Sequence, residues 1–476
     1  MSYKIKNLKF VFEPKSVALI GASSTHSKLG NVILKNLVEG GFEGKIYPVN
    51  PKYTSIMNMR CYSSVLDIKD KVDCAIISIP AIAVPKSLEE CGKKGVKGVI
   101  VLSGGFGESG NKILEEEVKN IANKYSIALI GPNCLGVFNP YKKLDSIFFP
   151  VYKLERPKQG SFSFITQSGG VGSCVIDLAA HFGVGLSKFI SYGNAAVVDE
   201  SDLLEFLESD KKTKQILLYI EGVKDGKKLL STLTRVNRKK PVIVLKAGKG
   251  QKASKAAFSH TGNIAGNYLA YDGAFKQSKV VVADSLEELF DFVKIFHQTL
   301  PKGDKIGVIT NGGGIGVLAV DEIEKEKLIL SDFSEETSKK LREFLPSYAT
   351  VSNPLDIIAD ANPSIYEKSL ELMLSDKNID CIIIIVLFQA PSLDDRLLNI
   401  LIKASDDRRK PIAVVAVGGD YTIMQRKTLD SYGVPTYRSP SDAVKAMKKL
   451  IDYAKYSGCR ECINPKKIKP EFKLTE

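Results

Sequence analysis

Apolar residues recur along the chain in short continuous runs that alternate with amphipathic segments. The runs VALIGASS from Val17, FSFITQSGGVGS from Phe162 and IGVITNGGGIGV from Ile306 share one order. Each passes from β-branched residues into a turn of small residues and then into a helical pattern. Continuous apolar strands separated by helices are typical of parallel sheets that helices cover on both faces. The pattern therefore predicts an α/β protein.

Three such starts, nearly evenly spaced, predict three doubly wound parallel-sheet domains. The polar stretches 139–145 and 300–305 are the expected joints between them. The expected boundaries are 1–142, 143–300 and 301–458 for the domains, and 459–476 for a C-terminal tail.

Hydropathy favours a protein that stays out of membranes. The longest apolar run, CIIIIVLF from Cys381, suits a buried strand and falls well short of the roughly 18 apolar residues that a membrane span needs. The opening MSYKIKNLKFVFEP alternates lysines with apolar residues and has no apolar block of the kind that signal peptides carry. We expect a cytoplasmic protein with no membrane contact.

The formal net charge of +13 first suggests nucleic acid as a partner. However, the lysines are spread along the chain among acids, and no nucleic-acid-binding motif accompanies them. A positive field that gathers phosphorylated small molecules accounts for the charge as well, so we expect no nucleic-acid partner. The 8 cysteines are scattered, several within apolar runs, which indicates buried free thiols. Cys459 and Cys462 form a lone CxxC, interpreted as a tail pair or a disulfide rather than a metal site.

The three glycine-containing loops are candidate anion sites. In doubly wound folds, ligands bind at the carboxyl ends of strands, where small residues let phosphate approach the N–H groups of a helix end. A tight strand-to-helix turn is the alternative for any single loop, but three such loops favour a phosphate-bearing ligand. Asn50-Pro51-Lys52 follows the second apolar strand, and Lys52 either meets a phosphate or is a solvated loop lysine.

A nicotinamide site is the competing interpretation. The first loop lacks a strict G-x-G-x-x-G, and Asn50 stands where such a site would have an acid for the ribose. The third loop does fit G-x-G-x-x-A from Gly314 to Ala319, with Asp332 further on. On pattern alone, an NAD-dependent dehydrogenase is therefore the alternative function.

His260 lies in AAFSHTGNIAG, among hydroxyl side chains and glycines. Such a histidine is either a hydrogen-bonded loop residue or a nucleophile, because neutral imidazole has a free ring nitrogen. As a nucleophile it would need a carboxylate on its other nitrogen. Glu221, at the end of ILLYIEG, could supply that carboxylate or could be an exposed loop acid. No second His or Cys lies at ligand spacing, so we expect no metal here.

The run LKAGKGQKASKAAFSHTGNIAG resembles the phosphohistidine segment of the NDP-forming acyl-CoA synthetases, which are relatives of succinyl-CoA synthetase. VALIGASS, LGNVILKNL, VNPK and GPNCLG resemble the CoA-binding domain of that family. ITQSGGVG, ISYGNAAVVDESDLLEFL and LYIEG resemble its second domain, and ITNGGGIGVLAVDEIE, SNPLDIIADA and KPIAVVAVGG its third. The resemblance covers nearly the whole chain. It implies a Rossmann-like CoA-binding domain followed by two flavodoxin-like domains.

The resemblance also implies a reaction: acyl-CoA, ADP and phosphate become free acid, ATP and CoA through an acyl phosphate and a phosphohistidine. By motif, His260 takes the phosphoryl group and Glu221 orients it. The implied phosphate-binding residues of the second and third loops are Ser168, Gly169, Gly170, Gly312, Gly313 and Gly314. The implied CoA-binding residues are Gly21, Ala22, Ser23, Lys28, Asn50, Pro51 and Lys52.

One domain of that family, the ATP-grasp domain that delivers ADP, has no matching stretch in this sequence. We therefore expect this chain to be the α subunit of a split enzyme. The resemblance implies a separate ATP-grasp β subunit that holds ADP or ATP with Mg²⁺, and an α2β2 heterotetramer. A non-catalytic CoA-binding regulator is the alternative within the family, although the intact SHTG argues against it. The acyl group could be acetyl, branched or aromatic.

Overall fold

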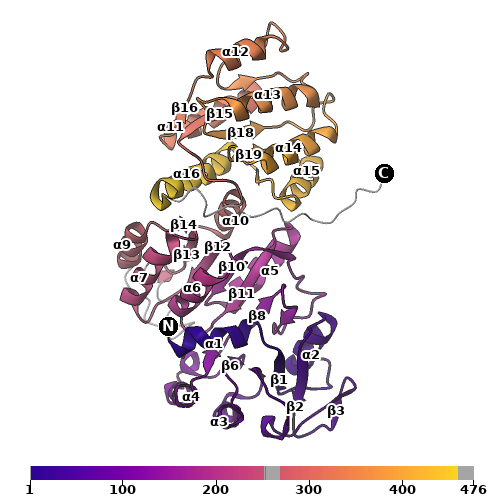
Figure 1. The fold of residues 1–476 in the computed structure, drawn as a ribbon, viewed down its shortest axis with the longest axis vertical. Coiled ribbons are helices and arrows are strands. Elements are labelled where there is room, and N and C mark those ends of the chain that lie inside the picture. The colour runs from indigo at the N-terminus through magenta and orange to yellow at the C-terminus, as the bar shows by residue number, and fades with distance from the viewer. Residues whose placement is uncertain (1, 251, 254–267, 459–476) are drawn as a thin grey trace. The chain divides into compact units, whose positions relative to one another are not determined.

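Three sheets of mostly parallel strands, bordered by helices, carry the chain (Figure 1). The computed structural model describes residues 2–250, 252–253 and 268–458. The predicted α/β class with doubly wound sheets is confirmed. Two compact units result: unit 1 is Met1–His181 with Gly185–Val282, and unit 2 is Phe182–Val184 with Ala283–Glu476.

The first sheet, in unit 1, has the strand order β2-β1-β5-β6-β7, and all neighbouring strands run parallel. Both of its faces are covered: Val17 and Leu19 pack in one apolar cluster with α1 and α2, and Ala18 and Ile20 pack in another with α3 and α4. This is why every residue of β1 is buried. The strands are β1 (Ser16–Ile20), β2 (Lys45–Val49), β5 (Cys74–Ile77), β6 (Gly98–Val101) and β7 (Ala128–Ile130). The helices are α1 (Tyr3–Phe12), α2 (Leu29–Glu39), α3 (Val84–Lys94) and α4 (Lys112–Lys124).

The second sheet, in unit 1 except for Ala283 at the end of β14, has the order β14-β13-β12-β10-β11-β8-β9. Its central strands β13, β12, β10 and β11 are parallel, while β8 is antiparallel to β11 and to β9. The polar stretch 139–145, expected as a joint, contributes to β8 and β9, and the predicted domain boundaries stay a prediction. The strands are β8 (Val137–Asn139), β9 (Leu144–Asp145), β10 (Gln159–Thr166), β11 (Leu186–Ser191), β12 (Gln215–Ile220), β13 (Val242–Lys246) and β14 (Val281–Ala283). The helices are α5 (Gly169–His181), α6 (Glu200–Ser209), α7 (Gly226–Asn237) and α9 (Tyr268–Ser278).

The third sheet, in unit 2, has the order β16-β15-β18-β19-β20, with β17 paired to β15. The apolar run from Cys381 forms the buried strand β18, as predicted. The strands are β15 (Lys305–Thr310), β16 (Ile329–Leu330), β17 (Leu355–Asp356), β18 (Cys381–Ile385), β19 (Ile412–Val415) and β20 (Thr436–Tyr437). The helices are α10 (Leu286–Ile295), α11 (Gly313–Lys325), α12 (Glu335–Arg342), α13 (Pro363–Ser375), α14 (Arg396–Asp407), α15 (Asp420–Ser431) and α16 (Pro440–Ser457).

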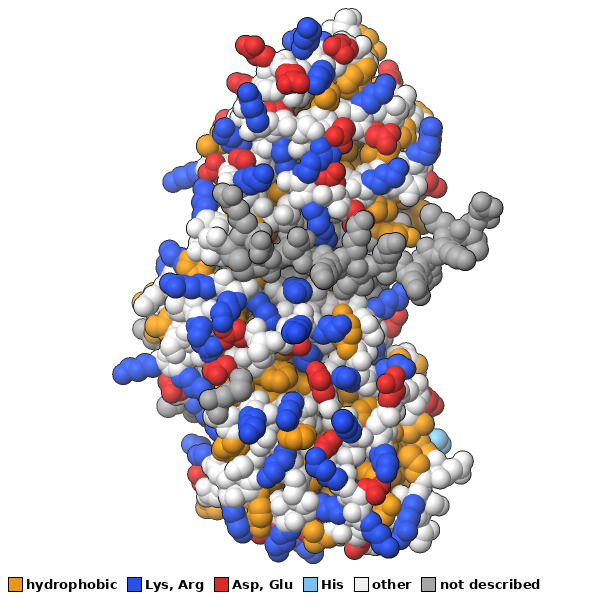
Figure 2. Space-filling model, viewed as in Figure 1, with side chains coloured by type: hydrophobic (Ala, Val, Ile, Leu, Met, Phe, Trp, Pro, Cys, Tyr) orange, Lys and Arg blue, Asp and Glu red, His pale blue; other side chains and the backbone are white. Residues whose placement is uncertain are grey.

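The surface mixes both signs of charge. On the face drawn in Figure 2, Lys and Arg side chains are dispersed and interleaved with Asp and Glu. Among the helices that the structure describes, none is both long enough and apolar enough to cross a bilayer. The six cysteines within the described ranges are free thiols, and all but Cys174 are buried, as predicted. Cys459 and Cys462 lie outside the described residues.

Candidate functional site

The first loop joins β1 to α2 by a close backbone approach that requires glycine. Gly21 has a φ of +96°, and a Cβ there would lie 2.3 Å from the carbonyl oxygen of Ser78. A Cβ on Gly30, in the first turn of α2, would lie 2.0 Å from the carbonyl oxygen of Gly21. The first turn of α2 is thereby pressed against the loop that carries Ala22 and Ser23. This is the arrangement in which helix N–H groups can face a phosphate.

The end of β2 is tied to this loop by Asn50. Its side-chain amide donates to the carbonyl of Ala22 at 2.8 Å, and its Oδ1 accepts from the backbone N–H of Lys52 at 2.9 Å. The structure thus brings together the two stretches predicted to bind CoA. Lys28, Pro51 and Lys52 are exposed beside them.

Tyr53 was missed by sequence reasoning, although it lies directly after Asn50-Pro51-Lys52. Its side chain is half-buried beside the first loop. The polar groups of Ser24, Ser23 and Thr25 favour the phenolate and lower the pKa of Tyr53 to about 8. A tyrosine one position beyond a predicted phosphate-contacting stretch is a weak signal. The position of Tyr53 beside the first loop depends on how the segment after β2 and the first loop meet in the fold.

The second loop forms the start of α5. Thr166 Oγ1 donates to the carbonyl of Ser168 at 2.9 Å, and Ser168 Oγ accepts from the N–H of Val171 at 3.3 Å. Gly169 and Gly170 open the helix, so their N–H groups have no carbonyl partner within it. Gly170 is exposed. The loop therefore offers amides, at the positive end of a helix dipole, to an anion.

Glu221 follows β12 and is buried, with 6% of its surface exposed, so the alternative of an exposed loop acid is wrong. Tyr219 donates its hydroxyl to Glu221 Oε1 at 3.3 Å. Gln167 Oε1 accepts from the N–H groups of Glu221 at 2.8 Å and Gly222 at 3.0 Å. Because Gln167 directly precedes Ser168, one side chain links the carboxylate's turn to the second loop.

Two further side chains, both missed from sequence, hold the same turn. Lys246, at the end of β13, donates to the carbonyl of Glu221 at 2.9 Å and to that of Ala247. Tyr271, on α9, accepts from the N–H of Val223 at 3.1 Å. With Gln167, these contacts satisfy three N–H groups and one carbonyl of residues 221–223.

His260 lies outside the described residues, as do Ser259, Thr261 and the flanking Gly262 and Gly266. Its proximity to Glu221 therefore stays a prediction. Within the described ranges, no group of three or more His, Cys, Asp or Glu side chains could hold a metal ion.

The third loop, in unit 2, repeats the form of the second. Gly312 precedes α11, which begins at Gly313, and Gly314 is exposed. Thr310 Oγ1 donates to the carbonyl of Gly312 at 3.0 Å. A Cβ on Gly313 would lie 2.5 Å from Asp356 Oδ2, so a larger residue there would have to displace that carboxylate.

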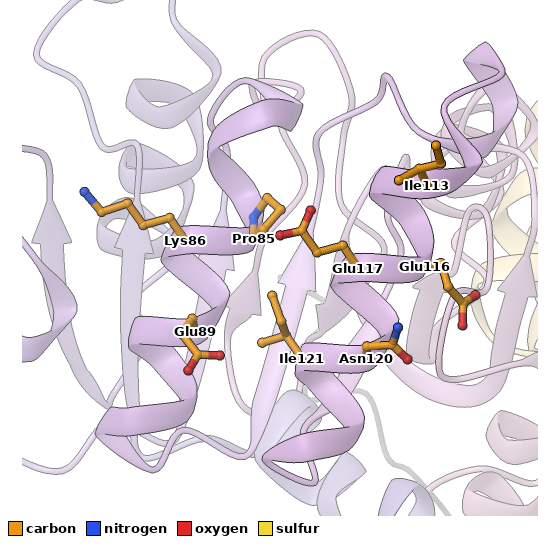
Figure 3. Close-up of a pocket in the computed structure, with 8 residues that line it drawn as sticks. All are labelled: Pro85, Lys86, Glu89, Ile113, Glu116, Glu117, Asn120 and Ile121. Atoms are coloured by element: carbon orange, nitrogen blue, oxygen red, sulfur yellow. The ribbon is translucent and has the colours of Figure 1, made fainter.

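A separate hollow of about 870 Å³ lies between α3 and α4 (Figure 3). Pro85 and Ile121 lie between the two helices, and carboxylates border the hollow. Its lining consists of Pro85, Lys86, Glu89, Ile113, Glu116, Glu117, Asn120 and Ile121. None of the sequence-predicted residues lines it, so it is not part of the candidate site.

Three family models match the chain in order. They are a CoA binding domain at residues 15–140, a succinyl-CoA ligase like flavodoxin domain at 159–296 and a Ligase-CoA domain at 306–448. These ranges contain all of the predicted site residues. Together the models cover most of the chain.

Named relatives match over almost the whole chain. The α subunit of an ADP-forming acetate–CoA ligase II of Pyrococcus furiosus is 40% identical, over 95% of this chain and 99% of its own length. An ADP-forming acetate–CoA ligase of Methanocaldococcus jannaschii is 43% identical over 94% of this chain, but the chain spans only 63% of that longer relative. A solved structure of a Ca. Korarchaeum cryptofilum dinucleotide-forming acetyl-coenzyme A synthetase, in complex with phosphate and ADP, is 34% identical. Its TM-score is 0.89, over 96% of this chain and 98% of that one.

Proposed function

The chain belongs to the NDP-forming acyl-CoA synthetase family, and from this premise we propose that it is the α subunit of an ADP-forming acyl-CoA synthetase. In this proposal it binds CoA on the first sheet and carries the phosphoryl group on His260 beside the second. The relatives named as α subunits match over 98% or more of their own length, which supports the subunit assignment.

The proposed reaction has three steps. A phosphate oxygen attacks the thioester carbonyl of the acyl-CoA, and CoA leaves as the thiolate to give an acyl phosphate. A ring nitrogen of His260 then attacks the phosphorus, and the carboxylate of the free acid leaves. Finally, a terminal oxygen of ADP attacks the phosphohistidine, which gives ATP and restores the imidazole. Bound Mg²⁺ would neutralise the nucleotide's charge on the partner subunit.

The observation that carries the proposal is a buried carboxylate beside a helix start that is suited to an anion. Glu221 and the loop Ser168–Gly170 follow neighbouring strands and share Gln167. A carboxylate and a phosphate repel each other unless a donor lies between them. An imidazole supplies that donor on one nitrogen and a nucleophile on the other. In our proposal Glu221 accepts the ring N–H, while the amides of Gly169 and Gly170 hold the phosphoryl oxygens.

CoA is assigned to the first loop on the same grounds. Gly21, Ala22 and Ser23 form a close-packed loop at a helix start, and Asn50 ties it to the end of β2. Exposed Lys28 and Lys52 supply charge for phosphates. The matching CoA-binding model over this region supports CoA rather than a nicotinamide. Gly312–Gly314 of unit 2 form a further proposed phosphate contact.

The proposed partner is a separate ATP-grasp β subunit, in an α2β2 assembly. Two relatives that carry the name "subunit alpha" are covered almost completely, while two relatives named as ligases without a subunit designation are longer than this chain. The added length of those ligases would correspond to the nucleotide-binding part. This chain alone is then expected to bind CoA and to synthesise no ATP.

The deciding experiment mixes the chain with this partner and ATP that is radiolabelled on its γ-phosphate. We expect acid-labile, base-stable label on the wild type and none on His260→Ala. His181→Ala is the matched control, because His181 is an exposed histidine at the end of α5 in the same unit. Equal labelling of wild type and His260→Ala would refute the proposal. CoA binding without any label would favour the regulatory alternative.

A further inference from the structure

Lys246 is a buried ammonium group directly behind the Glu221 turn. It ends β13, its side chain is 2% exposed, and β13 pairs with β12, which leads into Glu221. Its Nζ donates to the carbonyls of Glu221 and Ala247 and lies 4.6 Å from the centroid of the Tyr271 ring. The ammonium therefore faces two carbonyl oxygens and an aromatic ring.

Burial of this charge is unfavourable, and burial lowers the pKa of Lys246 to about 8. The negative charge of Glu221 acts in the opposite direction and favours the protonated amine. Lys246 thus acts on Glu221 in two ways: through the carbonyl that it holds and through its charge.

We propose that Lys246 is a positioning residue for phosphoryl transfer, whose ammonium fixes the Glu221 turn and attracts the Glu221 carboxylate. This inference rests on the proposed function, in which Glu221 orients His260. Lys246 does not touch the reacting atoms. Its effect should appear in the rate of phosphoryl transfer and only through Glu221.

Lys240, at the other end of the same strand, is a matched control. It lies just before β13, and its Nζ donates to the carbonyls of Leu207 and Asp210, both at 2.6 Å. Burial lowers its pKa to about 8 as well. The two lysines therefore have the same chemistry, but Lys240 holds the end of α6, and neither of its hydrogen bonds reaches the Glu221 turn.

The experiment measures one turnover of label transfer from γ-labelled ATP to the chain in complex with its partner. The variants are Lys246→Met, Lys240→Met, Glu221→Gln and the double variant Lys246→Met with Glu221→Gln. A misfolded fraction lowers the amplitude of labelling, whereas misplacement of Glu221 lowers the rate constant at full amplitude. We expect Lys246→Met to slow the rate constant about tenfold or more and Lys240→Met to leave it unchanged. The double variant should be no slower than Glu221→Gln alone.

Three outcomes overturn the proposal. A Lys246→Met rate constant equal to that of Lys240→Met would show that the residue is only structural. A double variant that is slower than Glu221→Gln by the full Lys246→Met factor would show that Lys246 does not act through Glu221. If Lys246→Met does not fold, Lys246→Gln takes its place, because glutamine keeps a donor for the carbonyl but lacks the charge. A wild-type rate constant for Lys246→Gln would refute the role of the charge. Absence of label on wild type would instead contradict the proposed function itself.

Discussion

The second and third sheets have the same loop at the end of a central strand, but different side chains lie on the neighbouring strands. Thr166 and Thr310 each end a strand and donate their hydroxyl to the carbonyl two residues on, at 2.9 and 3.0 Å. The next residue is an amide in both sheets. Gln167 Oε1 accepts from the N–H of Glu221, and Asn311 Oδ1 accepts from the N–H of Leu387 at 2.8 Å. In each sheet the amide therefore fixes the backbone that follows the neighbouring strand.

The two sheets differ in the residues that this amide fixes. In the register of the strands, Glu221 of the second sheet corresponds to Leu387 of the third. By the same register, Lys246 corresponds to Ala416. We call the side-chain amide that accepts these backbone hydrogen bonds, Gln167 in the second sheet and Asn311 in the third, the amide clamp. It is thus a feature of the fold that occurs both with and without an acidic residue. The buried carboxylate and the buried ammonium occur together in only one of these two described sheets. The groups that hold the loop are therefore distinct from the groups that we propose to act in the reaction.

The largest expected effect comes from removal of the charge at Glu221. Glu221→Gln keeps the shape of the side chain but replaces an oxygen acceptor with an amide that donates, so the His260 imidazole would lose the orienting partner that we propose for it. We expect turnover in complex with the partner to fall by about 100-fold or more, because a charged group that is aimed at the reacting centre is lost. Steady-state ATP formation from acyl-CoA, ADP and phosphate measures this.

Calorimetric titration with CoA is the control for this variant, since the first loop is unchanged and its affinity for CoA should stay at the wild-type value. Turnover within twofold of wild type would contradict the role given to Glu221. It would also remove the functional difference between the two sheets.

The amide clamp gives the next largest effect, on stability. Gln167→Leu leaves two N–H groups without their acceptor, those of Glu221 and Gly222. Asn311→Leu removes the acceptor of one N–H group, that of Leu387, and a longer bond of 3.4 Å from its amide to the Leu387 carbonyl. We expect each to lower the free energy of unfolding by about 1–3 kcal/mol, with Gln167→Leu the larger of the two. Urea unfolding, followed by circular dichroism, measures both. A larger loss for Asn311→Leu would show that the two clamps are not equivalent.

The loops could be predicted from sequence because their signals are local. A β-branched strand followed by small residues is readable without knowledge of the fold, and so is a glutamate that ends an apolar strand. Lys246 could not be singled out in the same way. A lysine at the end of an apolar strand is usually solvated, and here its burial depends on Tyr271, which arrives on a later helix. Tyr53 was missed for the same reason, since its contacts lie on another loop.

The smallest expected effect concerns the first loop, where an amide again ties two strand ends together: Asn50 donates to the carbonyl of Ala22. Here the additional group is the Tyr53 hydroxyl, whose pKa is lowered to about 8 by the polar groups of Ser24, Ser23 and Thr25. The chain has no Trp, so absorbance at about 295 nm reports tyrosinate with little interference. We expect one tyrosine to ionise near pH 8 in the wild type and none in Tyr53→Phe, while Tyr152→Phe, at an exposed surface position, keeps that step.

Binding of CoA should raise the pKa of Tyr53. A bound phosphate repels the phenolate, so the pKa of Tyr53 must be higher in the complex than in the free chain. The protonated form then binds more tightly, and affinity for CoA falls as the pH rises through 8. Desulfo-CoA is the appropriate probe, because it lacks a thiol that titrates in the same range. We expect its affinity for wild type to fall about two- to fivefold between about pH 7 and pH 9, and that of Tyr53→Phe to fall less. Equal pH dependence in the two proteins would place the CoA phosphates away from the first loop. The similarity between Asn50 and the amide clamps of the other two sheets would then be structural and not functional.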